Sequence, residues 1–225
     1  MYSKRYQKIK KQVDSTKSYN LGEAIDLIKS LKSAKFDETI DIHIKLGINP
    51  SKTEQQAKGS VILPNGAVKT KKIVAFVSEK HVQEAKDAGA DLVGGEELIK
   101  EIKETGKCNF DVAVAHPDMM RSLAQVAKVL GPKGLMPTPK LGTITEDISK
   151  IIGELKKGKV AFKNDAGGNV HQAMGKVSWN KEKIQGNMEA FLAAVRKSKP
   201  AGVKSNFIKS VSIASTMGPG LKISI

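Results

Sequence analysis

Apolar residues follow two different patterns in this chain, and the two patterns occupy different parts of it. From Ile40 to Leu46 every second residue is apolar, and the residues between them are polar or charged: Asp41, His43 and Lys45. A period of two is typical of a strand with one buried and one exposed face. The same alternation recurs late in the chain, at 207–214, at 221–225 and, more weakly, at 170–179. Both ends of the chain are therefore expected to contribute half-exposed strands.

Two amphipathic helices accompany these strands. The first has an apolar stripe at helical spacing, Ala24, Ile25, Ile28 and Leu31. Asn20 is its predicted N-cap, and Glu23, three residues later, predicts a capping box. The second stripe is made of Ile184, Met188, Phe191, Leu192 and Val195. Half-exposed strands covered on one face by two helices predict an α+β layer.

The middle of the chain shows the second pattern, which is continuous rather than alternating. Residues 73–77 and 111–115 are short apolar runs, typical of strands that are buried on both faces. Helical segments are predicted at 80–88, 96–104, 119–130 and 147–156, each followed by a capping glycine. This order predicts a parallel α/β sheet inserted into the outer domain. We expect one domain from residues 1–66 and 160–225, and another from 67–159.

Charge follows the same division. The 225 residues include 38 Lys and Arg against 23 Asp and Glu, a net charge of +15. The outer segments hold 22 basic and 10 acidic residues, net +12, whereas the middle holds 16 and 13, net +3. A basic domain of this kind predicts a polyanionic partner. Only 10 residues are aromatic, which favours a folded nucleic acid recognised by backbone and shape over stacked single-stranded bases.

Other classes of function find little support in the sequence. The single cysteine and four scattered histidines form no metal-ligand spacing, so we expect no metal site and no disulfide. The glycines of residues 131–142 match neither nucleotide-loop motif, and we expect no cofactor. No apolar run is long enough to span a membrane, and the expected location is the cytoplasm. The protein is predicted not to be an enzyme; the alternative is a nucleotide-dependent RNA-modifying enzyme that uses the middle domain.

Two short segments of the basic region have residues suited to binding a ligand. Residues 35–39 lead into the first strand, and residues 215–219 lead out of a late one. In the second segment Thr216 offers a hydroxyl, Met217 a deformable apolar surface and Gly218 a close approach of backbone.

The chain resembles the L-one family of ribosomal proteins along nearly its whole length. The segments that carry the resemblance are Ala34-Lys-Phe-Asp-Glu-Thr-Ile40, Gly94-Gly-Glu-Glu97, Leu130-Gly-Pro-Lys-Gly-Leu-Met-Pro-Thr-Pro-Lys140, Phe162-Lys-Asn-Asp165 and Ser215-Thr-Met-Gly-Pro219. The resemblance implies a discontinuous α+β domain of split β-α-β type, with an inserted Rossmann-like domain that binds no dinucleotide.

The resemblance also implies function and partners. Members bind a folded segment of large-subunit rRNA at the mobile stalk, assist release of deacylated tRNA from the exit site, and can repress translation of their own operon mRNA. A monomer is implied for the protein free of the ribosome. Carried onto this chain, the implied RNA-binding residues are Lys35, Phe36, Thr39, Ser210, Thr216, Met217 and Gly218. Candidates for further RNA contacts are Lys133, Lys140, Lys163 and His171.

Overall fold

The computed structural model describes residues 3–14, 17–32, 34–200, 202–203 and 206–224. The chain forms two compact units, Met1–Val68 with Val160–Ile225 (unit 1) and Lys69–Lys159 (unit 2). The expected fold class is confirmed. Unit 1 is an α+β domain assembled from both ends of the chain, and unit 2 is an α/β domain with a parallel sheet.

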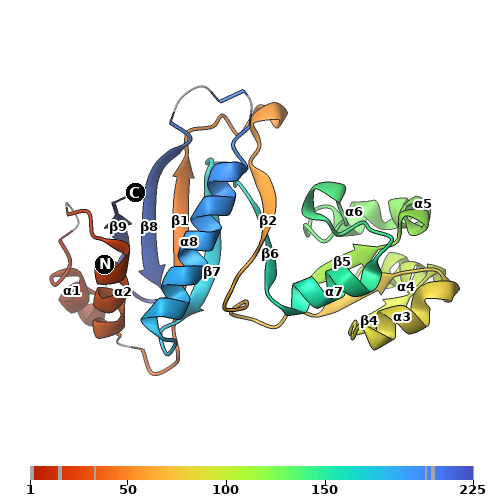
Figure 1. The fold of residues 1–225 in the computed structure, drawn as a ribbon, viewed down its shortest axis with the longest axis horizontal. Helices are drawn as coiled ribbons and strands as arrows, with labels where there is room; N and C mark the ends of the chain where they lie inside the picture. The colour runs from red at the N-terminus through yellow and green to blue at the C-terminus, as the bar shows by residue number, and fades with distance from the viewer. Residues whose placement is uncertain (1–2, 15–16, 33, 201, 204–205, 225) are drawn as a thin grey trace. The chain divides into compact units, whose positions relative to one another are not determined.

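Unit 1 is built on a four-stranded antiparallel sheet of order β7-β1-β8-β9 (Figure 1). Its strands are β1 (Thr39–Leu46), β7 (Asn169–Lys176), β8 (Ile208–Ser215) and β9 (Leu221–Ile223). Strands β7 and β8 both run antiparallel to β1, so they are parallel to each other, and helix α8 (Lys181–Lys197) connects them. The result is a split β-α-β unit with a strand from the N-terminal part at its centre. Residue 225, at the end of the last predicted strand, lies outside the described residues.

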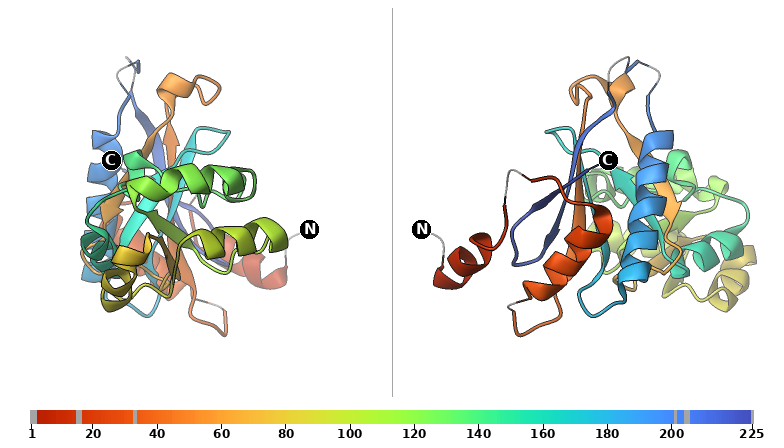
Figure 2. Two further views of the ribbon diagram at one scale, coloured as in Figure 1. Left: turned by 90° about the vertical axis from the view of Figure 1, so that its right-hand side faces the viewer. Right: turned by 60° about the vertical axis from the view of Figure 1, so that its left-hand side comes forward.

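One face of this sheet is covered by helices. Helix α2 (Leu21–Ser30) and α8 contact each other and lie on the same face, side by side in the right panel of Figure 2. The alternation in β1 places Ile40, Ile42 and Ile44 in this core with no exposed surface. Burying each such side chain stabilises the fold by roughly 2 kcal/mol. The opposite face, which we call the open face, carries the polar residues of the same strands.

Unit 1 also contains elements that the hydrophobic pattern did not predict. They are helix α1 (Lys4–Lys10), the 3-10 turn η1 (Thr53–Gln55) and a two-stranded sheet of β2 (Lys58–Ile62) and β6 (Lys159–Lys163). Asn20 occupies the N-cap of α2 as expected, but its side chain makes no cap hydrogen bond. The predicted capping box with Glu23 is therefore not formed.

Unit 2 contains a parallel sheet of order β4-β3-β5, with β3 (Ile73–Phe76) in the centre, β4 (Leu92–Gly94) and β5 (Val112–Ala115). Alternate residues of β3 enter two different hydrophobic cores. Val74 and Phe76 belong to one core, and Ile73 and Ala75 belong to the other. The prediction of strands buried on both faces is thus confirmed. The longer helices are α4 (Glu96–Thr105) and α7 (Ile148–Lys156); the shorter elements are η2 (Glu79–His81), α3 (Val82–Asp87) and η5 (Pro139–Leu141).

The helix predicted over 119–130 is wrong as a single element. The segment consists of η3 (Pro117–Met119), α5 (Met120–Leu123), η4 (Ala124–Val126) and α6 (Ala127–Leu130). Gly131 has φ −60° and does not adopt the left-handed conformation, which occurs at Gly134 instead, with φ 70°. Apolar spacing cannot distinguish one helix from successive short turns here, because both direct the same side chains, including Leu123 and Leu130, into the core.

Candidate nucleic-acid interface

Three segments of unit 1, distant in sequence, meet at one end of the four-stranded sheet. Thr39 begins β1, and Thr216 directly follows β8. The Thr39 N–H donates to the Thr216 hydroxyl at 3.0 Å, and the Thr216 N–H donates to the Thr39 carbonyl at 3.0 Å. On the other side of β1, Val177 donates its N–H to the carbonyl of Glu38 at 2.9 Å. Residues 34–39, 176–178 and 215–218 therefore form one continuous structure.

A buried carboxylate joins two of these segments. Glu38 is 1 % exposed, and its two oxygens accept hydrogen bonds from the backbone N–H groups of Ala34 (3.2 Å) and Met217 (3.1 Å). Charge-assisted bonds of this kind are stronger than those between neutral groups. Glu38 thus fixes the loop before β1 against the loop after β8.

The third segment is attached through Asp37 and Lys176. The Asp37 carboxylate accepts from the Ser178 N–H at 3.1 Å and the Ser178 hydroxyl at 2.8 Å. The Lys176 ammonium donates to the Thr39 hydroxyl at 3.0 Å and to the Asp37 carbonyl at 3.3 Å. Because these groups are held by protein partners, the loop is organised before any ligand arrives.

Apolar side chains project from this hydrogen-bonded framework. Phe36 is 52 % exposed and Met217 42 % exposed, unusual values for large hydrophobic residues. Lys35 beside them is exposed as well. Gly218 lies in the turn that follows β8, where an added Cβ would stand 2.5 Å from the Ser215 hydroxyl oxygen. We call Lys35, Phe36, Thr39, Thr216, Met217 and Gly218 the strand-end surface; it contains six of the seven residues predicted as the principal site.

The seventh residue, Ser210, lies near the other end of β8, paired with Lys45 of β1. Thr216 lies six positions further along the chain, a distance of roughly 20 Å for extended strand. Alternation still places both side chains on the open face, together with Ser212. Ser210 therefore extends the predicted site along the open face and is not part of the strand-end surface.

The four candidates for further contacts are dispersed. His171 lies on the open face, opposite His43 of β1, and Lys163 is exposed at the end of β6. Lys133 belongs to unit 2, where its ammonium donates to the Gly106 carbonyl at 2.9 Å. The backbone of Lys140 lies in η5, and its side chain lies outside what the structure describes.

Two carboxylates near the open face have shifted pKa values. Hydrogen bonds from the backbone and side-chain N–H groups of Asn169 lower the pKa of Asp165 to about 2, so this carboxylate is ionised at neutral pH. Burial raises the pKa of Asp41, and the positive charge of nearby histidines and Lys176 opposes that rise. Asp41 and Asp165 place negative charge within a strongly basic unit.

Sequence reasoning missed Glu38 and Lys176, the residues that organise the strand-end surface. Both are charged residues flanking predicted strands, and such residues usually face solvent. The one available signal was that a charged pair, Asp37 and Glu38, directly precedes the alternating strand in the loop segment already singled out as a site. That signal does not reveal that Glu38 is buried.

Unit 2 contains two cavities that bear on the nucleotide-dependent alternative. The larger, about 600 Å³, lies at the carboxyl ends of β3 and β4, the edge where sheets of this class bind nucleotides. Its lining includes three carboxylates, of Glu79, Glu96 and Glu97, against one ammonium, of Lys100. This charge disfavours phosphate groups at the edge where the fold would bind them.

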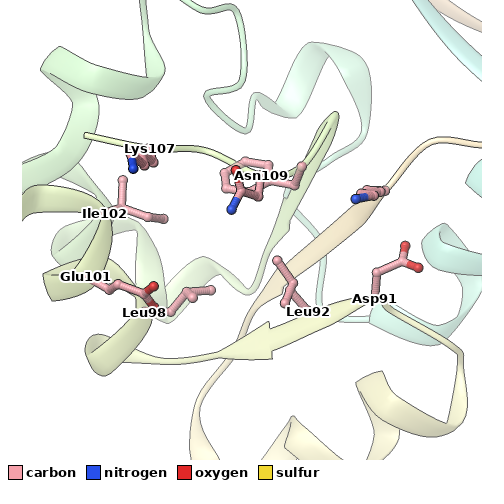
Figure 3. A pocket seen from close by; sticks show the side chains of 9 residues that line it. Asp91, Leu92, Leu98, Glu101, Ile102, Lys107 and Asn109 are labelled. Carbon is pink, nitrogen blue, oxygen red and sulfur yellow. The ribbon is translucent and has the colours of Figure 1, made fainter. Parts of the chain in front are cut away.

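The smaller cavity, about 330 Å³, lies at the opposite edge of the sheet (Figure 3). Leu92 from β4 and Leu98 and Glu101 from α4 project toward it, and Asp91 at its edge accepts the backbone N–H of Ile73 at 2.8 Å. It lies at the amino ends of the strands, away from the usual nucleotide position. Within the described residues, no group of three or more His, Cys, Asp or Glu side chains is arranged to hold a metal ion.

Among the described residues, no helix combines the length and the apolar character needed to cross a bilayer.

Comparison with known proteins gives a consistent result. Residues 27–219 match the model of the Ribosomal protein L1p/L10e family. The chain is 49 % identical to the large ribosomal subunit protein uL1 of Kosmotoga olearia over 98 % of its own length and 95 % of that protein. It is 48 % identical to the protein of the same name from Protochlamydia amoebophila, over 99 % and 94 % of the two chains. These matches, which span both units and are to ribosomal proteins and not to enzymes, show that the chain belongs to the ribosomal protein L1p/L10e family.

Proposed function

We propose that this chain is a structural protein of the large ribosomal subunit and that it binds a folded segment of large-subunit rRNA. The strand-end surface is the principal contact, and the open face toward Ser210 extends it. The observation that carries the proposal is the Glu38 carboxylate, which holds together two loops that present exposed apolar residues and hydroxyls in the most basic part of the chain. Membership of a ribosomal protein family supports the choice of RNA as the polyanion.

The hydroxyls of Thr39 and Thr216 differ in the hydrogen-bonding capacity that remains for a ligand. The Thr39 oxygen accepts from Lys176, so its own proton remains available for donation. The Thr216 hydroxyl accepts from the Thr39 N–H and donates to the Thr39 carbonyl at 3.3 Å, which leaves one lone pair to accept. A ribose 2′-hydroxyl both donates and accepts. The pair is therefore suited to ribose and would favour RNA over DNA.

Phe36 and Met217 supply the apolar part of the contact. Placed against a ribose edge in a shallow RNA groove, they exclude water from the hydroxyl bonds and strengthen them. Lysines such as Lys35 hold phosphates, a contribution that carries no sequence information and weakens with salt.

The finer parts of the proposal rest on the resemblance to the L-one family of ribosomal proteins. We infer that the protein acts at the mobile stalk of the subunit in the cytoplasm, that it assists release of deacylated tRNA from the exit site, and that it represses its own operon mRNA. Repression needs no second site, because a messenger segment that folds like the rRNA segment would occupy the same rigid surface. The alternative of a nucleotide-dependent enzyme is disfavoured, since the acidic cavity of unit 2 disfavours the binding of phosphate.

Binding of purified bacterial large-subunit rRNA, measured by filter retention against small-subunit rRNA and DNA competitors, tests the proposal. The double variant Phe36→Ala, Met217→Ala should lose at least tenfold in affinity. The control is Ile62→Ala, which removes a similarly exposed apolar side chain from β2. Equal affinity of wild type, double variant and control would reject the strand-end surface; equal affinity for all three nucleic acids would reject rRNA recognition.

A further inference from the structure

We propose that the His43–His171 pair on the open face is a further contact for a backbone phosphate of bound RNA, and that this contact takes up one proton. The inference rests on the proposed function, because it requires that RNA covers the open face. It adds a distinct property, a dependence of RNA affinity on pH that lysine contacts cannot produce.

The pair lies in a cross-strand row on the open face. His43 of β1 is paired with His171 of β7 on one side and with Ser212 of β8 on the other, and Ser212 is paired with Lys222 of β9. The two imidazole Nδ1 atoms are 2.8 Å apart, and the ring centroids are 5.0 Å apart. At 2.8 Å the nitrogens share one proton, since neither two lone pairs nor two N–H groups could approach so closely without repulsion.

The neighbouring carboxylate determines which ring donates that proton. His171 Nε2 is 3.4 Å from the Asp165 carboxylate, which is ionised and can only accept. Nε2 of His171 therefore carries hydrogen, and in the neutral ring Nδ1 of His171 is an acceptor. His43 must then donate through its Nδ1. The Nε2 atom of His43, which takes part in neither of these hydrogen bonds, retains its lone pair.

A proton can be added at this remaining nitrogen without breaking the pair. When His43 Nε2 takes a proton from solvent, the Nδ1 hydrogen bond to His171 is kept and becomes charge-assisted. A proton added at His171 Nδ1 would instead break the bond and place two N–H groups against each other. Partial burial and the neighbouring His171 lower the pKa of His43, so the free protein holds this site mainly neutral at pH 7.

The charged groups around the pair come from four elements. Asp41 and Lys45 flank His43 on β1, Asp165 precedes β7, Lys176 ends β7, and Lys222 lies on β9. Lys45 is held by the Gly167 carbonyl at 2.6 Å. Asp41 favours the protonated form of His43, and the lysines oppose it. A phosphate placed over the row would add a negative charge beside Nε2, favour its protonation and accept its hydrogen bond.

Affinity measured against pH tests the inference. Binding of bacterial large-subunit rRNA should strengthen severalfold between about pH 7.5 and pH 6, and by no more than tenfold per pH unit, the limit for one proton. His43→Gln, which retains a side-chain donor and acceptor, should remove the part of this pH dependence that comes from the histidine pair and leave only the part that comes from the RNA bases. The control His81→Gln, in unit 2, should retain both parts. Because wild type and variants are measured with the same RNA, proton uptake by the RNA bases contributes equally to each of them and drops out of the difference between them.

A second readout follows the proton directly. In NMR titrations of the folded protein, the pKa of His43 should rise when RNA is bound. A pH dependence unchanged in His43→Gln, or an unchanged His43 pKa in the complex, would overturn the inference and leave RNA binding itself intact. A pH dependence abolished by Asp41→Asn but kept in His43→Gln would assign the proton to Asp41 and also overturn it. Failure to bind rRNA at any pH would instead reject the proposed function.

Discussion

The hydroxyl of Thr216 accepts the backbone N–H of Thr39, a residue 177 positions earlier in the chain, at 3.0 Å. This bond joins the start of β1 to the end of β8 at the point where the proposed RNA contact is centred. It also means that the Thr216 hydroxyl has a structural role before RNA binds. A substitution of Thr216 therefore changes the structure of the surface in the free protein as well as its contact with RNA.

Thr216→Val should weaken rRNA binding by about fivefold or more, corresponding to about 1 kcal/mol for a lost hydrogen bond. The dependence of affinity on salt should stay as in the wild type, because no charge is removed. Thr216→Ser keeps the hydroxyl and should recover most of the affinity. Filter binding at several salt concentrations measures both quantities; a recovered hydroxyl without recovered affinity would contradict the prediction.

Lys35→Ala should have the complementary effect. Removing one phosphate contact reduces the slope of log affinity against log salt by about 0.9 and weakens binding to all RNA sequences alike. Lys100→Ala, which removes a lysine from the acidic cavity of unit 2, is the matched control and should leave the slope unchanged. An identical slope for wild type and Lys35→Ala would remove Lys35 from the phosphate contacts.

Glu38→Gln should lower the free energy of unfolding by about 1 to 3 kcal/mol, the usual cost of leaving a buried group without its partner. The amide retains one acceptor oxygen but turns an N–H group toward one of the two backbone N–H groups that the carboxylate binds. Urea denaturation measures the change, with Glu54→Gln, an exposed glutamate in η1, as the control. rRNA affinity should fall as well, because the two loops lose their connection; a stable variant with normal affinity would contradict this role.

Asp165→Asn should destabilise the β6–β7 turn in a manner that depends on pH. The folded-state pKa of Asp165, about 2, lies below the ordinary value of an unfolded aspartate, about 3.9. The carboxylate therefore stabilises the folded state above about pH 4, and this contribution is lost as the pH falls toward 2. The difference in thermal midpoint between wild type and variant should shrink over that interval.

Asn169→Ala provides a graded comparison for that experiment. It removes the side-chain donor to Asp165 and keeps the backbone N–H that binds the same carboxylate at 2.7 Å. Its loss of stability should follow the same pH interval with a smaller amplitude. If the difference in thermal midpoint between wild type and Asp165→Asn stays constant down to pH 2, the hydrogen bonds do not favour the ionised form of Asp165.

Hydrophobic periodicity was sufficient to predict the main elements of both units. Alternation in β1 and β8 reflects a sheet with one covered face, and the continuous run in β3 reflects two covered faces, so burial and sequence pattern have the same physical cause. Elements without such a pattern were missed. Strand β4 has three residues, and the 119–130 segment buries the same side chains as a single helix would, so neither could be determined from periodicity.

The sequence by itself determined the composition of the proposed binding region: a basic α+β domain from both chain ends, with apolar and hydroxyl residues in two loops. Only the tertiary structure decided how those residues are combined. The hydrogen bonds of buried Glu38 to the loop after β8 and the contact of His43 with His171 depend on which strands pair and in which register. Strand pairing joins residues more than a hundred positions apart, and local sequence patterns carry no information about such contacts.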